Sequence, residues 1–277
     1  MGRVETRMYK RKRKRARTLR RVLLLLILAA AAVLLWRGGG ASFVAERIGL
    51  PNATPISDAF DQTPETREVT LPEETWYAIQ TGVFSTQEAA LQKAEAYRDR
   101  GAPGTVVEES EKWRVFIACY GSEQEASSVR ARLEQNQKVD TYLYAWICPE
   151  LRLRLTSKAG LLDVVEAGFT LLNTTAVQLR DTAIALDAAQ LTHQEALAEA
   201  TALMGQMELW EQTARKRFGS NIPELVQNML DMTTAWDARF GNLQASENAT
   251  ALSAALKAEA MGMFHDIATW RRAMAEK

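Results

Sequence analysis

Histidine and cysteine, which supply many catalytic and metal centres, are scarce in this chain: its 277 residues include two of each. His193 is followed by Glu195 in a pattern typical of the first turn of a capped helix, and His265 stands alone beside Asp266. The sequence has no glycine-rich phosphate loop, no cluster of cysteine and histidine, and no nucleophile elbow. We therefore expect a binding or structural protein rather than an enzyme, with no cofactor and no metal ion.

The chain has no net charge, but its basic and acidic residues are unevenly distributed. Residues 1–21 contain eleven Lys and Arg and one Glu, whereas the rest of the chain contains 23 basic and 33 acidic residues. The basic block leads into a long apolar run, Val22–Trp36 (VLLLLILAAAAVLLW). A basic flank beside such a run is typical of the positive-inside signal of a membrane anchor, and it explains the basic residues without a nucleic acid partner.

The apolar run is short for a membrane span. At 1.5 Å per residue it covers about 22 Å of a hydrocarbon core roughly 30 Å thick, so its flanking residues would extend toward the interfaces. We expect a cytoplasmic tail at residues 1–21 and a transmembrane helix at residues 22–36 that contacts the lipid bilayer. The alternative is a cleaved signal peptide, since small residues follow at Gly38–Ser42, and the protein would then be secreted. In both cases the chain that follows lies outside the cytoplasm.

Residues 37–73 have the composition of a flexible linker. They contain four of the seven prolines of the chain and mixed charges, without a sustained apolar period. Such a linker would let a membrane-anchored domain search a surface beyond the bilayer.

An internal duplication follows at residues 74–150. Trp76 begins an alternating run (WYAIQTGVF) and Ala89 follows thirteen residues later; Trp113 begins a second run (WRVFIACY) and Ala126 follows at the same interval. Each half is predicted as strand, helix, strand, with boundaries at residues 76–84, 86–100, 104–109, 113–120, 123–135 and 141–148. Two such halves predict a small ferredoxin-like βαββαβ fold with both helices on one face of the sheet.

Strand alternation predicts which side chains lie on the face without helices. In the first strand this face carries Trp76, Ala78, Gln80, Gly82 and Phe84, and Cys119 of the third strand is expected on the opposite face. The other strands add the remaining members of the uncovered face: Arg114, Phe116, Ala118, Tyr120, Tyr142, Tyr144 and Trp146. Aromatic rings next to a few hydrogen-bonding groups suit the C–H faces and hydroxyls of a polysaccharide. The alternative is that these rings pack under the C-terminal region.

The two runs AIQTGVFSTQEAA (residues 78–90) and WRVFIACYGSEQEA (residues 113–126) resemble the half-repeats of the SPOR (sporulation-related repeat) domain. Gln80, Gly82, Phe84 and Arg114 match its pattern one by one. Ala118 and Cys119 depart from it, because a small residue followed by proline is expected there. The resemblance covers about residues 74–149.

The resemblance implies binding to peptidoglycan, particularly to glycan strands stripped of their stem peptides, at cell-division or sporulation septa of bacteria. Together with the uncovered face it gives a predicted set of glycan-binding residues: Gln80, Gly82, Phe84, Arg114, Phe116, Tyr144 and Trp146.

The two cysteines are predicted to stay unpaired. With the strand order 4-1-3-2 usual for this architecture, the first strand lies between those bearing Cys119 and Cys148. The two residues are then at least two strand spacings apart, roughly 9.6 Å, beyond the approximately 7 Å limit for a disulfide. Cys119 is expected to be a small core residue.

Residues 151–277 are predicted to be helical, because they are rich in Ala, Leu, Met, Gln and Glu. Apolar residues at spacings of three and four predict four amphipathic helices, at about residues 157–189, 192–218, 221–240 and 247–275. A capping box, Thr192-x-x-Glu195, starts the second, and Gly241 is expected to stop the third. The default is an internal bundle; the alternative is a surface for self-association or for a protein partner.

The whole chain is thus predicted to be an α+β protein with an anchoring helix before the SPOR-like domain and an all-α bundle after it. Its predicted function is non-covalent, membrane-anchored binding of peptidoglycan in the cell envelope. The alternative is an envelope scaffold for protein interactions, in which the C-terminal helices are the functional part.

Overall fold

The computed structural model of the protein describes the backbone of residues 64–276 and, except at Asn242, their side chains. The predicted tail at 1–21, the predicted span at 22–36 and most of the predicted linker lie outside these residues. Within residues 64–276 no helix is long and apolar enough to cross a membrane.

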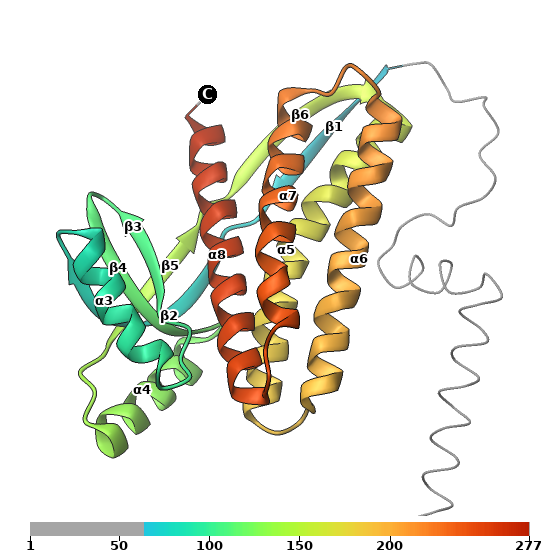
Figure 1. Ribbon diagram of the computed structural model, residues 1–277. Helices are drawn as coiled ribbons and strands as arrows, with labels where there is room; N and C mark the ends of the chain where they lie inside the picture. Colours follow the sequence, from blue (N-terminus) through green and yellow to red (C-terminus); the bar gives the residue numbers. More distant parts are fainter. Residues whose placement is uncertain (1–63, 277) are drawn as a thin grey trace, which may run out of the picture. The chain divides into compact units, whose positions relative to one another are not determined.

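A four-stranded antiparallel sheet with two helices forms the first half of this region (Figure 1). Its elements are β2 (Glu74–Phe84), α3 (Gln87–Arg98), β3 (Thr105–Glu109), β4 (Lys112–Tyr120), α4 (Glu123–Gln137) and β5 (Tyr142–Cys148). The strand order β3-β4-β2-β5 is the predicted order, and the βαββαβ sequence of elements is confirmed. The duplication extends to the helix starts, because the Thr86 and Ser122 hydroxyls each accept a hydrogen bond from a backbone N–H three residues later.

A two-stranded arm extends this sheet. β1 (Pro64–Leu71) pairs with β6 (Leu151–Lys158), and β1 runs through Pro72 and Glu73 into β2 while β5 runs through Pro149 and Glu150 into β6. The arm corrects two predictions, since residues 64–71 were assigned to the linker and residues 151–158 to the helical region. Apolar residues alternate in both strands and supply the reason: Val69 and Leu71 lie opposite Leu153 and Leu151.

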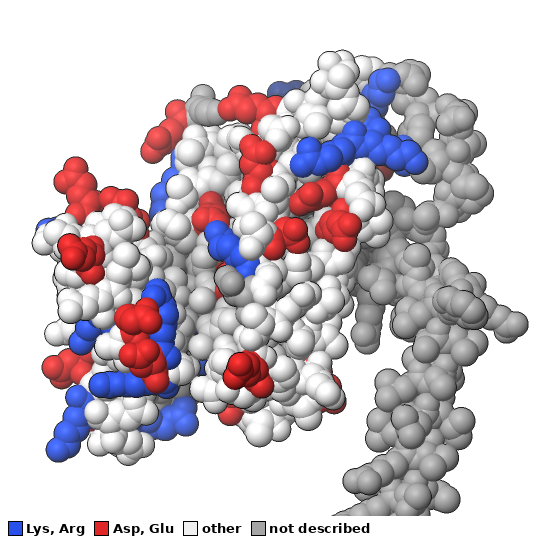
Figure 2. All heavy atoms as spheres, viewed as in Figure 1, with Lys and Arg blue, Asp and Glu red and all other residues white. Residues whose placement is uncertain are grey.

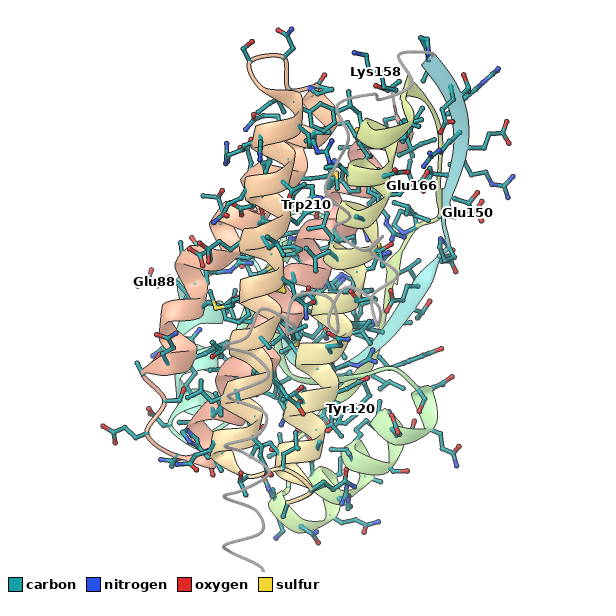
Figure 3. All side chains as sticks on the ribbon, turned by 90° about the vertical axis from the view of Figure 1, so that its right-hand side faces the viewer. Glu88, Tyr120, Glu150, Lys158, Glu166 and Trp210 are labelled. Carbon is teal, nitrogen blue, oxygen red and sulfur yellow. The ribbon has the colours of Figure 1, made fainter. Side chains whose placement is uncertain are left out.

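Four helices follow the arm: α5 (Ala159–Asp187), α6 (His193–Phe218), α7 (Glu224–Gln244) and α8 (Ala249–Ala275). The predicted capping box at Thr192 is present. α7 passes through Gly241 and ends three residues later, which corrects the predicted stop; Gly241 is not among the glycines with a positive φ, so its backbone continues the helix. Trp210 of α6 points toward α5 (Figure 3), where its Nε1 donates to the Val164 carbonyl over 2.9 Å.

The helices and the sheet share one hydrophobic core. Phe264 of α8 stacks on Trp76 of β2 with ring centroids 4.2 Å apart, and it meets Trp146 of β5 edge-on at 5.7 Å. All three rings belong to the same cluster of buried residues as the interior of the helices. The face of the sheet opposite α3 and α4 is therefore packed against α8.

Arg271 of α8 holds the junction between sheet and arm. Its side chain is 1% exposed, and its Nη1 donates to the carbonyls of Pro72 (2.8 Å) and Pro149 (3.2 Å), which lie at the two points where the strands pass from sheet to arm. Its Nη2 donates to Asn173 Oδ1 of α5 at 2.8 Å. One guanidinium thus joins both strand junctions to two helices.

Replacing Arg271 by methionine should destabilise the protein strongly. Three part-buried hydrogen bonds would lose their charged donor, and we expect the free energy of unfolding to fall by roughly 3 kcal/mol in urea titrations. Arg272→Met is the control: Arg272 is exposed and donates once, to the Ile147 carbonyl, so its loss should cost less than about 1 kcal/mol. Equal effects of the two substitutions would contradict the assigned role of Arg271.

Both cysteines are free, as predicted, and both are buried, although burial was predicted only for Cys119. Cys119 lies on β4 and Cys148 on β5, with β2 between them. Burial is the main cause that raises the pKa of the Cys119 thiol to about 12 and that of Cys148 to about 11.

The native protein should therefore resist thiol reagents. Because a raised thiol pKa keeps the proton on sulfur below that pKa, at pH 8 about one molecule in a thousand or fewer carries the reactive thiolate at either site. We expect labelling with Ellman's reagent to be negligible in buffer and to reach both thiols in urea. Fast native labelling, or an intramolecular disulfide in the native mass, would contradict this arrangement.

Candidate functional site

The sheet face opposite α3 and α4 contains the candidate site, but two β-bulges change its membership. Ile79 pairs with Ala118 and Gln80 with Phe116, which leaves Ile117 as an extra residue in β4. Gln80 and Gly82 pair with Phe116 and Val115, and the residue between them in β2 is likewise extra. Each bulge adds one residue to a strand and reverses the alternation beyond it.

The bulges correct the predicted faces. Phe84 belongs with the residues packed under α3 and α4, and Gly82 pairs with Val115 of that same cluster. Ala118 and Tyr120 also belong to this cluster, whereas Cys119 belongs to the core shared with the long helices. The predicted site is thus divided between two faces: Gln80, Arg114, Phe116, Tyr144 and Trp146 share one, while Gly82 and Phe84 lie on the other.

Three of the five residues on the shared face are buried, and two of these are aromatic. Phe116 is 1% exposed and Trp146 is 2% exposed, and their rings contact each other at 5.2 Å under α8. The expectation that these rings lie open is therefore wrong. The alternative predicted from the sequence, that these rings pack under the C-terminal region, is correct for Phe116 and Trp146.

The cover is permanent on energetic grounds. A buried aromatic side chain removes about 150–250 Å² from water, worth about 4–6 kcal/mol at 25 cal/mol per Å². Detaching α8 would expose at least Trp76, Trp146 and Phe264 together, at a cost on the order of 10 kcal/mol, comparable to the whole stability of a domain. Binding therefore has to use the part of the face that α8 leaves accessible.

A hydrogen-bonded cluster lies in the accessible part and is called here the polar cluster: Gln80, Glu109, Arg114 and Tyr144. Arg114 Nη1 donates to Gln80 Oε1 at 2.9 Å and its Nε donates to Glu109 at 3.0 Å. The Tyr144 hydroxyl donates to the same carboxylate oxygen of Glu109. The guanidinium also lies over the Tyr144 ring, 4.7 Å from its centroid. These contacts fix the guanidinium in one position.

The polar cluster is only partly withdrawn from water. The side chains of Arg114 and Glu109 are 23% and 25% exposed, whereas Gln80 is buried. Burial, and then the hydrogen bond to Glu109, raise the pKa of Tyr144 to about 12. The Tyr144 hydroxyl therefore remains a donor at any physiological pH.

Two exposed apolar side chains share the face of the polar cluster. Tyr142 lies opposite Gln80 and is 63% exposed; Val83 lies opposite Arg114 and is 44% exposed. An exposed ring beside fixed donors and acceptors can hold a flat, hydroxyl-bearing ligand.

α8 also contributes to the surroundings of the cluster, which sequence reasoning missed. The His265 ring lies 5.7 Å from Trp146, and Arg272 Nη2 donates to the Ile147 carbonyl of β5 at 2.9 Å. Burial lowers the pKa of His265, with Asp266, Arg272 and Glu109 acting on it at longer range. The adjacent arginines in the last turns of a helix were the available signal, but only the packing shows which strand they reach. Among residues 64–276 no group of His, Cys, Asp and Glu could hold a metal ion.

Comparison with known families identifies the sheet region. The sequence model of the SPOR domain matches residues 63–145, which confirms the expected family of this segment. The chain is also similar to the solution structure of the peptidoglycan binding domain of the B. subtilis cell wall lytic enzyme CwlC, with 22% sequence identity over 26% of this chain and 91% of that chain, and a TM-score of 0.24. No curated protein matches the chain.

Alanine substitutions at two neighbouring residues of β2 test whether the bulges reverse the alternation at the end of the strand. Phe84→Ala should lower the free energy of unfolding by about 1–2 kcal/mol, because the half-buried ring packs under the helices. Val83→Ala, on the exposed face, should change it by less than about 0.5 kcal/mol. If β2 alternated regularly up to its end, urea titrations would give the reverse order.

Proposed function

Because residues 63–145 contain a SPOR domain, we propose that the protein binds peptidoglycan glycan strands non-covalently, outside the cytoplasm. One observation carries the proposal: the accessible part of the sheet face combines the exposed ring of Tyr142 with the polar cluster. The residues that bind are those of this part rather than the whole aromatic face.

Tyr142 is the proposed platform for a sugar ring. A phenol ring presents apolar area to the C–H face of a pyranose, and Val83 extends that area on the same face. Water is displaced from both surfaces on contact, which favours association without any reaction.

The polar cluster is proposed to orient the glycan through hydrogen bonds. Arg114 has N–H groups that the cluster does not use, and Glu109 and the Tyr144 hydroxyl oxygen can accept, so the cluster can match hydroxyl and acetamido groups of a glycan. Gln80 is buried and holds Arg114 in place rather than touching the ligand. Since the cluster is already ordered by its own hydrogen bonds, little side-chain freedom is lost on binding.

The buried members of the sequence-predicted set have supporting roles. Phe116 contacts the Tyr144 ring at 5.5 Å and Trp146 backs Phe116, so both fix the position of Tyr144. Gly82 and Phe84 lie on the helix-covered face, where the half-buried ring of Phe84 packs against the core. They act on folding rather than on the glycan.

The cellular setting extends the proposal. The apolar run Val22–Trp36 behind a basic tail supports a single-pass anchor with the N-terminus in the cytoplasm, and cleavage after it would yield a secreted form. The SPOR domain supports a location facing the cell wall and targeting to the division or sporulation septum. Fractionation of cells producing the full chain, with immunodetection of its size, separates the anchored form from the cleaved one.

A second candidate function is that of an envelope scaffold. The burial of Phe116 and Trp146 favours it, because the helices occupy much of the face that would otherwise meet a glycan. In Figure 2 the lower half of the helices beside the sheet is largely uncharged, whereas charges of both signs gather over the sheet and its two short helices. A surface of that kind suits contact with another protein.

Binding of the full chain to purified sacculi tests the first function against the second. We expect retention on amidase-treated sacculi, reduced about tenfold by Tyr142→Ala because the sugar platform is removed. Arg114→Ala should reduce it similarly through the loss of charged hydrogen bonds.

Matched exposed residues elsewhere serve as controls. Leu209→Ala on α6 and Arg152→Ala in the arm remove an exposed apolar side chain and an exposed arginine, and should leave retention unchanged. If the unmutated chain is not retained at all, the glycan function fails and the scaffold function is favoured.

A further inference from the structure

The edge strand β5 leads from the proposed sugar platform to the last turns of α8. Tyr142 and Tyr144 lie on its accessible face, and the Ile147 carbonyl, five residues beyond Tyr142, accepts from Arg272. At about 3.4 Å per residue this path is roughly 17 Å long. A polymer lying along β5 would therefore meet Tyr142 first and Arg272 last.

Arg271 and Arg272 are adjacent residues of α8 with different roles. Arg271 points inward and its charge is used in joining the strand junctions. Arg272 is exposed, and its single hydrogen bond to Ile147 holds the guanidinium against the edge of β5 without using most of its donors. An arginine fixed in this way is prepared to receive a ligand group.

Arg272 differs from Arg114 in its charge balance. Arg114 is neutralised by Glu109 at 3.0 Å, so the polar cluster carries no surplus positive charge. Within residues 64–276, no ion pair joins Arg272 to a carboxylate. Its charge also reaches the site, since Arg272 acts together with Arg114 to oppose the rise of the Tyr144 pKa.

We propose that Arg272 is a specificity-determining residue of the glycan site, and that its guanidinium pairs with a carboxylate carried by the glycan strand. The lactyl carboxylate of a muramic acid residue without its stem peptide has this chemistry, and a planar guanidinium can receive it with two parallel hydrogen bonds. The inference rests on the proposed function of the sheet face. It adds to the site a residue of α8, outside the segment that matches the SPOR domain.

Two preparations of the same glycan test this role with the full chain. The first is amidase-treated sacculi with free carboxylates; the second is the same material after carbodiimide coupling to methylamine, which turns the carboxylates into neutral amides. We expect the unmutated chain to bind the first about tenfold more tightly, the advantage expected of a charge-assisted pair. Salt at 1 M should shrink this ratio, because screening then acts over about 3 Å.

Substitutions test whether the side chain of Arg272 causes the difference in affinity between the two preparations. Arg272→Gln should bring the ratio of the two affinities to about one while leaving binding to the amidated glycan unchanged, and Arg272→Lys should restore part of the ratio. Arg152→Gln, which removes an exposed arginine of the arm, should keep the full ratio. A merely structural role of Arg272 would instead lower binding to both preparations equally.

The outcomes separate the two proposals. Equal binding of the unmutated chain to both preparations, or an unchanged ratio in Arg272→Gln, would overturn the role of Arg272 and leave the glycan function standing. Absence of binding to both preparations would overturn both.

Discussion

The packing of α8 across the sheet is the contact on which the rest of this structure depends. Phe264 stacks on Trp76 and meets Trp146, so one helix closes the core of the sheet and the core of the bundle together. That contact decides which aromatic residues are structural and which remain available to a ligand. It also brings Arg271 and Arg272 to the strands, where one holds the fold together and the other faces the accessible surface. A sheet of the same sequence without α8 would present a different surface.

Much of the fold was predictable because its signals are local or periodic. The duplicated spacing of Trp76 and Trp113 gave the two halves of the sheet, and the capping box at Thr192 gave the start of α6. The arm was missed because β1 begins at one proline, Pro64, and ends directly before another, Pro72, and because its partner β6 is 80 residues further along the chain. β6 alternates clearly (LRLRL), but alternation within one strand does not reveal a partner 80 residues away, and β1 has only Val69 and Leu71 as apolar residues after Pro64.

The candidate site was predictable only in part, for a different physical reason. Gln80, Arg114 and Tyr144 could be placed on one face from alternation, and the structure brings them into one hydrogen-bonded cluster. Gly82 and Phe84 were misplaced because a bulge is a single extra residue without a distinct sequence signature here. The burial of Phe116 and Trp146 could not be deduced either, since it depends on how the long helices pack against the sheet.

The arm gives the domain a defined response to mechanical load. A pull on the chain at Pro64, directed away from Lys158, would peel β1 from β6 and separate its eight ladder pairs one after another. Peeling would reach Leu71 and then meet Pro72, whose carbonyl is held by Arg271. The arm would yield first and lengthen the connection, while the sheet behind the guanidinium kept its shape. In a domain that is bound to a surface while its chain is under tension, the linker would lengthen before the bound sheet is disturbed.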